Sequence, residues 1–148
     1  MASMSVEEPE VQAHAQEPSS PVVALLSRQL ASGLWDEAGS GSAEVRQARA
    51  TARALLELRQ AGLTTGHPLH GAQVKKAVAA LVKLAAEITT SEARVAEFAL
   101  GVAWLVATGR RTRKEIELVI ARHAAFGTLR PHVGDEQAVR TYIEQLAP

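Results

Sequence analysis

Residues 98–107 read FALGVAWLVA, and the first polar side chain after them is Thr108. A helix that is apolar on nearly every side is normally the buried centre of a helical bundle. We therefore expect a helix over about residues 92–108, with Trp104 buried in the core. Other helices must then surround it.

Apolar residues also recur at helical spacing in five further segments. Ser42 and Asp135 fit N-caps of two of them, and Thr112 with Glu115 fits a capping box for another. No segment alternates polar and apolar residues for long, as a half-buried strand would. The fold class predicted is all-α, a compact bundle of five to six helices, over about residues 20–33, 42–61, 71–88, 92–108, 113–125 and 135–146.

The charge and cysteine content of the 148 residues exclude several classes of protein. Sixteen Lys and Arg balance sixteen Asp and Glu, which argues against non-specific binding of nucleic acid. The absence of cysteine excludes disulfide scaffolds, thiolate metal sites and cysteine nucleophiles. No apolar run reaches the roughly 18 residues of a membrane span, so we expect a cytoplasmic protein that does not enter the membrane.

The first twenty residues differ from the rest in composition. They contain four glutamates, two prolines and no Lys or Arg, with only scattered apolar side chains. Such a segment buries too little surface to offset the entropy of ordering it. The sequence therefore predicts a disordered acidic tail or linker over residues 1–20, followed by a single helical domain over residues 21–148.

Catalytic and phosphate-binding motifs are missing from the sequence. It has no G-x-S-x-G, no G-x-x-x-x-G-K-[ST] and no G-x-G-x-x-G. His67 and His70 in the run HPLH are the nearest approach to a metal or catalytic site, but zinc requires three or four ligands. We interpret these histidines as turn residues, expect no enzymatic activity and no cofactor, and keep a His-based metal site or enzyme as an alternative.

One basic cluster lies between the fourth and fifth predicted helices: Arg110, Arg111, Arg113 and Lys114. A contact with a phosphate or with RNA is one interpretation. A solvated corner is the other, and it is favoured because the chain is neutral and no aromatic residue is interleaved. A small helical nucleic-acid-binding domain therefore stays an alternative.

The end of the first predicted helix is the candidate partner-binding surface. Leu30, Leu34 and Trp35 lie at the end of a broad apolar stripe, and tryptophan is enriched where proteins bind one another. A stripe of this width can bind a partner or a second copy of the chain. The alternative is that these residues simply close the bundle.

The stretch from Leu25 to Trp35 resembles the C-terminal helical region of proteins that bear a VIT domain and a von Willebrand factor A domain. The shared pattern is two apolar residues, a Gln and a Gly-x-Trp turn, filled here by Leu25, Leu26, Gln29, Gly33 and Trp35. The downstream run Ala103-Trp104-Leu105 resembles another part of that region. This chain lacks the Asp-x-Ser-x-Ser metal motif of A domains, so no metal function follows from the likeness.

The resemblance implies a docking role. In the branch of vault-associated poly(ADP-ribose) polymerases, the corresponding region binds the major vault protein, a large shell protein. We therefore expect a non-catalytic protein–protein interaction or targeting module, taken from the C-terminal part of a larger protein. Its partner would be a protein, with a shell or scaffold protein suggested by the likeness and self-association as a second arrangement.

Overall fold

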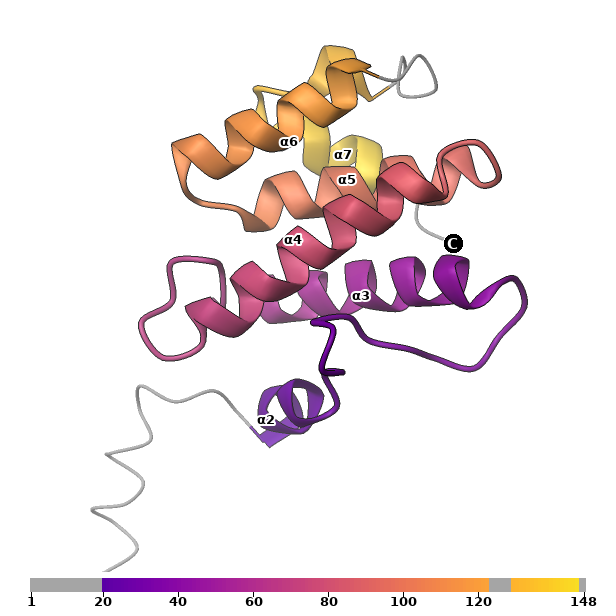
Figure 1. The fold of residues 1–148 in the computed structure, drawn as a ribbon. Coiled ribbons are helices and arrows are strands. Elements are labelled where there is room, and N and C mark those ends of the chain that lie inside the picture. The colour runs from indigo at the N-terminus through magenta and orange to yellow at the C-terminus, as the bar shows by residue number, and fades with distance from the viewer. Residues whose placement is uncertain (1–19, 123–128, 147–148) are drawn as a thin grey trace, which may run out of the picture.

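The computed structural model describes residues 20–122 and 129–146, and every described element is helical (Figure 1). The all-α bundle of five to six helices is confirmed, with six α-helices and one 3-10 turn in these residues. They are α2 (Ser20–Ser27), α3 (Ala43–Gln60), α4 (Gly71–Glu87), α5 (Ala93–Val106), α6 (Arg110–Arg122), the 3-10 turn η3 (Arg130–His132) and α7 (Glu136–Leu146).

Helix α5 is the centre of the fold, as its sequence predicts. It packs against α3, α4, α6 and α7, which surround it in Figure 1. Every residue from Ala96 to Ala107 is buried. A Cβ atom placed on Gly101 would lie 3.0 Å from Cγ1 of Ile143, so the glycine lets α7 approach the backbone of α5 closely.

Trp104 is buried between α5 and α6, which confirms its predicted place in the core. Its side chain is 3% exposed, and its indole Nε1–H donates to Oε2 of Glu117 over 3.0 Å. The guanidinium of Arg113 lies 4.1 Å from the ring centroid, and its Nε–H donates to the Trp104 carbonyl over 3.0 Å. These contacts fasten α6 to α5.

One carboxylate is also buried in α5, at Glu97, which is 5% exposed. Its Oε2 accepts from the backbone N–H of Leu129 over 3.2 Å and from the Tyr142 hydroxyl over 3.3 Å. A buried carboxylate is tolerated when such donors replace water. Glu97 therefore links α5 to the segment that precedes η3 and to α7.

Two predicted helix caps are confirmed, and one is wrong. The Ser42 side chain accepts from the N–H of Val45, and the Asp135 side chain accepts from the N–H groups of Gln137 and Ala138 in the first turn of α7. Thr112 does not start a helix, because α6 already begins at Arg110 and the N–H of Arg113 bonds to the Gly109 carbonyl over 3.0 Å. The capping box with Glu115 is therefore absent.

The first helix is shorter than its apolar spacing predicts, since α2 ends at Ser27 rather than near Gly33. The chain instead forms a turn in which the N–H of Gly33 bonds to the Leu30 carbonyl, and the N–H of Leu30 bonds to the Leu34 carbonyl. The predicted tail lies outside the described residues up to position 19, as do residues 123–128, which include His123.

Replacing Trp104 by alanine is expected to lower the free energy of unfolding by about 3–5 kcal/mol, because a large buried side chain leaves a cavity. Chemical denaturation followed by circular dichroism measures the change. Leu118→Ala on α6 is the control, since Leu118 is 58% exposed and its loss should cost below about 0.5 kcal/mol. Equal stability of the two variants would place Trp104 outside the core.

Candidate functional site

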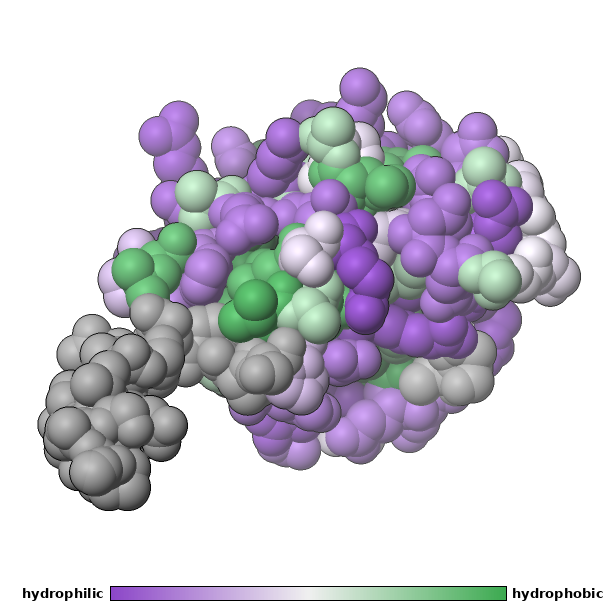
Figure 2. Space-filling view, turned by 90° about the horizontal axis from the view of Figure 1, so that it is seen from below, coloured by the Kyte–Doolittle hydropathy of each residue, from purple (hydrophilic) through white to green (hydrophobic). Residues whose placement is uncertain are grey.

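The predicted surface at the end of the first helix is divided between core and solvent. Leu30 is 41% exposed, whereas Leu34 is 8% and Trp35 is 3% exposed. Leu34 and Trp35 are thus buried in the bundle, which agrees with the alternative that they close it, and of the three candidates only Leu30 is exposed. Seen from the side of α2, the surface shows hydrophobic side chains in separate patches among hydrophilic ones (Figure 2).

Trp35 anchors the segment after α2 to α3. Its indole Nε1–H donates to the Leu25 carbonyl over 2.8 Å, and its backbone N–H donates to Oγ1 of Thr51 over 2.8 Å. Thr51 is fully buried on α3. The Thr51 hydroxyl and the Trp35 backbone N–H are therefore partners in a buried hydrogen bond, so neither is left unpaired away from water.

Gly33 and Gln29 attach the same segment to α4. Gly33 has a φ of +98°, and a Cβ there would lie 2.9 Å from Cγ and 3.0 Å from the carbonyl oxygen of Lys76. The Gln29 side-chain amide donates to the carbonyls of Gly33 and Gln73, over 2.9 and 3.1 Å. The residues that carry the VIT and A-domain resemblance at this end thus hold α2 and its turn on the bundle.

The basic cluster lies in the first turns of α6, and its four cations are not equivalent. Arg110, Arg111 and Lys114 are exposed. Arg113 is half-buried and engaged, since its Nη2–H donates to Oε1 of Glu136 over 2.8 Å in addition to its contacts with Trp104. Only three of the four predicted anion-contact residues are therefore left to face a ligand.

His67 and His70 lie in the loop before α4, where His67 has a structural role. Its Nδ1 accepts from the backbone N–H groups of Leu69 and His70, each over 3.1 Å. The His70 ring stacks on the His67 ring and its Nδ1 lies 3.2 Å from Oε1 of Gln73. Within residues 20–122 and 129–146, no three His, Asp or Glu side chains are grouped as a metal site requires.

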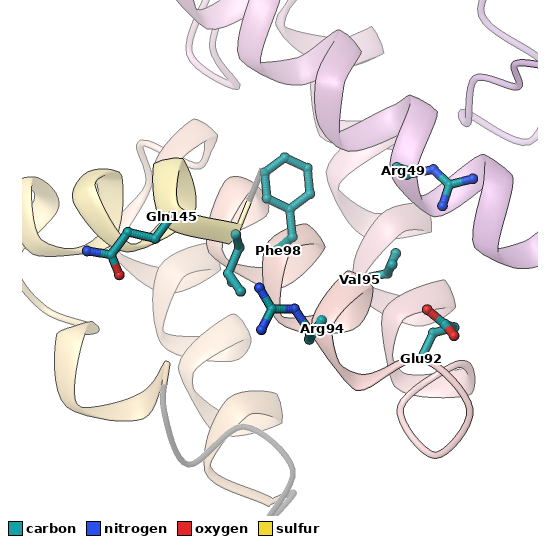
Figure 3. A pocket seen from close by; sticks show the side chains of 7 residues that line it. Arg49, Glu92, Arg94, Val95, Phe98 and Gln145 are labelled. Atoms are coloured by element: carbon teal, nitrogen blue, oxygen red, sulfur yellow. The ribbon is translucent and has the colours of Figure 1, made fainter. Parts of the chain in front are cut away.

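A shallow cavity of about 310 Å³ lies between α3, α5 and α7 (Figure 3). Phe98, Val95 and Leu146 supply its apolar lining, with Arg94 and Arg49 beside them. Arg49 is already bonded to Glu37 and to the Ser40 carbonyl. The cavity holds neither a nucleophile with an adjacent base nor a set of metal ligands.

A second hollow, more apolar in its lining than the first, is a groove between α4 and α6, with a volume of about 380 Å³. Both helices pack on α5 but touch each other little, so their facing sides are left apart. Val78 and Ile116 are buried, and Val82 and Val119 are half-buried. The other lining residues, more polar or smaller, are Thr65, Lys75, Ala79, Thr112 and Glu115.

Sequence reasoning missed this groove, although it assigned its apolar residues to helix stripes. A stripe read from one helix does not show whether another helix covers it. The sequence signal for the groove is the width of the apolar stripe on α4, which includes Val82, a residue that the packing leaves half-buried.

The chain matches no protein-family model, no curated protein and no solved structure. The likeness to the VIT and A-domain proteins therefore rests on the residues quoted above. In the described part of the chain, no helix is both long and apolar enough to cross a membrane.

Gly33→Ala is expected to destabilise the protein by about 1–3 kcal/mol, because the new Cβ needs a rare backbone conformation and meets the Lys76 backbone. Gly62→Ala is the matched control, since Gly62 has a φ of +86° with nothing within 4 Å of its Cβ position. Thermal and chemical denaturation should show a smaller loss for Gly62→Ala. Equal losses of stability in the two variants would mean that the close contact of Gly33 with α4 contributes nothing to the effect.

The Glu136 carboxylate should make stability depend on pH. Its pKa lies below the ordinary 4.5, chiefly through the hydrogen bond from Arg113 and also through the charges of Arg113 and Arg59. A lowered pKa in the folded state stabilises the protein above the ordinary value, and this stabilisation is lost as the pH falls through the lowered pKa.

Glu136→Gln should therefore cost up to about 1 kcal/mol at pH 7, a modest amount because the side chain is 54% exposed. The difference from the parent should shrink as the pH falls below 4.5. Urea denaturation at pH 7, 5 and 3 measures it, with Glu144→Gln on the same helix as control. If the stability difference between Glu136→Gln and the parent grew toward acid pH, the lowered pKa of Glu136 would be contradicted.

Proposed function

We propose that this chain is a non-catalytic protein-interaction module that receives a partner segment in the groove between α4 and α6. The observation that carries the proposal is the gap between two helices that share α5 as their support and leave valine side chains between them. A hydrophobic groove between helices is a recurrent docking place for a helix of a partner protein.

The groove is built as binding grooves usually are, with an apolar floor and a polar edge. Val78 and Ile116, each 2% exposed, belong to the core beneath it. Lys75, Glu115 and Thr112 line it together with the valines. Burying half-exposed valines contributes affinity, and polar groups at the edge contribute orientation.

The two alternative functions have less support. For nucleic-acid binding, one of the four cations is bound to Glu136 and lies over Trp104. The other three lie at the N-terminal end of α6, where the helix dipole disfavours cations. For a His-based site, the His67 ring nitrogen is used in its own turn.

The wider context is proposed from the resemblance alone. The module would belong to the C-terminal region of a larger VIT and von Willebrand factor A-type protein in the cytoplasm, and its partner would be a large shell or scaffold protein. Self-association of the chain is the second arrangement. Neither arrangement requires a cofactor.

A photo-crosslinking amino acid at Val82 should identify the partner, and binding of that purified partner can then be measured by calorimetry. Ala79→Glu should weaken binding by about tenfold or more, since a charge is placed in an apolar lining. Ala121→Glu is the matched control, because Ala121 is also an exposed alanine, on α6, and lines none of the hollows described above.

Both variants should keep the helical circular dichroism spectrum of the parent. Leu30→Asp tests the surface predicted from the sequence, and it should leave binding within about twofold. If Leu30→Asp abolished binding and Ala79→Glu did not, the partner would dock at the end of α2 and the groove assignment would be wrong.

A further inference from the structure

We infer that the partner segment for the groove is a short amphipathic helix with acidic residues beside its apolar stripe. This inference rests on the proposed function and adds the chemistry of the partner. It is carried by the charge of the two helices that form the groove.

Both walls carry an excess of positive charge. Beside the lining of α4 the exposed charges are lysines, and on α6 Arg111 and Arg122, each one helical turn from a lining residue, outnumber the lining Glu115. Lys75 lines the groove itself, and Lys83 lies one helical turn beyond the lining residue Ala79. Both lysines are exposed, so they can meet carboxylates at the edge of a bound helix.

The excess of positive charge beside the groove does not depend on charged side chains that are paired within the fold. Arg113 is bound to Glu136, and Glu117 accepts from the Trp104 indole. Glu115 is the acidic residue in the lining, and it lies one turn from Arg111 on the same helix, the spacing at which opposite charges attract. A partner with a basic surface would face net repulsion from both walls.

The length of the groove fits two turns of helix. Its lining runs from Lys75 to Val82 on α4 and from Thr112 to Val119 on α6. Each stretch rises about 10 Å at 1.5 Å per residue. That length accommodates apolar side chains at positions i, i+4 and i+7 of a partner helix, between the valines of the two walls.

Neither residues 1–19, judged by their sequence, nor the described helices offer a comparable segment. Residues 1–19 supply four glutamates but also two prolines, and their apolar residues lack helical spacing. Among the described helices, α7 alone has more acidic than basic residues, and its apolar residues Val139 and Ile143 are buried. Two copies meeting through α4 and α6 would place like charges together.

Two designed peptides of 15 residues test the inference, with leucines at the same i, i+4 and i+7 positions and either glutamates or lysines at the flanking positions. Binding to the full chain is measured by fluorescence anisotropy, and the site is located by amide chemical shifts. The acidic peptide should bind about tenfold tighter than the basic one in dilute buffer. The difference should shrink as salt is added, because exposed charges are screened.

Charge reversal at the groove should invert the preference. Lys75→Glu with Lys83→Glu should favour the basic peptide, while Arg110→Glu with Lys114→Glu is the matched control. Arg110 and Lys114 are exposed on α6 but line a different hollow, beside Trp104. An equal effect of the two pairs would show general attraction to a basic protein and would overturn the inference.

The remaining outcomes separate the inference from the proposed function. Tighter binding of the basic peptide in the groove would overturn the acidic chemistry and keep the docking function. If neither peptide shifted the groove amides, docking in the groove would fail and the inference with it.

Two further outcomes would name a different occupant and overturn the inference. One is a shift of the groove amides, without peptide, when Glu7, Glu8, Glu10 and Glu17 are changed to Gln in the full chain. This result would assign the groove to the chain's own first residues. The other is a concentration-dependent shift with a dimer in sedimentation, which would assign it to a second copy.

Discussion

The structure depends on one constraint, the need of α5 to be covered on every side. From Ala96 to Ala107 the helix has one polar side chain, Glu97, whose carboxylate is hydrogen-bonded inside the protein. A helix without a polar face cannot lie at the surface. Four helices meet this need, and each is placed by its contact with α5 more than by contact with its neighbours. The gap between α4 and α6 follows from this arrangement, because two helices that share a support need not touch each other.

The N-terminal segment is attached by a different kind of interaction. Helix α2 has eight residues, too few to be stable without tertiary contacts. Hydrogen bonds from Trp35 to Thr51 and Leu25, and from Gln29 to the α4 backbone, hold it in place. The Gly-x-Trp pattern that suggests a family therefore has a clear structural role, in which the glycine allows contact with α4 and the tryptophan completes the core.

Much of the fold could be predicted from local pattern, and much of the candidate site could not. The run around Trp104 and the caps at Ser42 and Asp135 act within a few residues, so they can be read from the sequence. The burial of Trp35 depends on Thr51, which lies sixteen residues away, and the groove depends on two helices whose separation only the packing on α5 determines. An apolar stripe has the same appearance in a sequence whether a neighbour covers it or leaves it open.

The two tryptophans also give the molecule a pair of independent optical reporters. Trp35 donates to a backbone carbonyl where α2 meets α3, and Trp104 donates to a carboxylate under a guanidinium where α5 meets α6. Since the emission of an indole changes with the polarity around it, detachment of α2 would change the signal of the first tryptophan, and movement of α6 that of the second. In variants that keep one tryptophan each, intrinsic fluorescence can thus separate events at the N-terminal attachment from movements of α6, one wall of the groove.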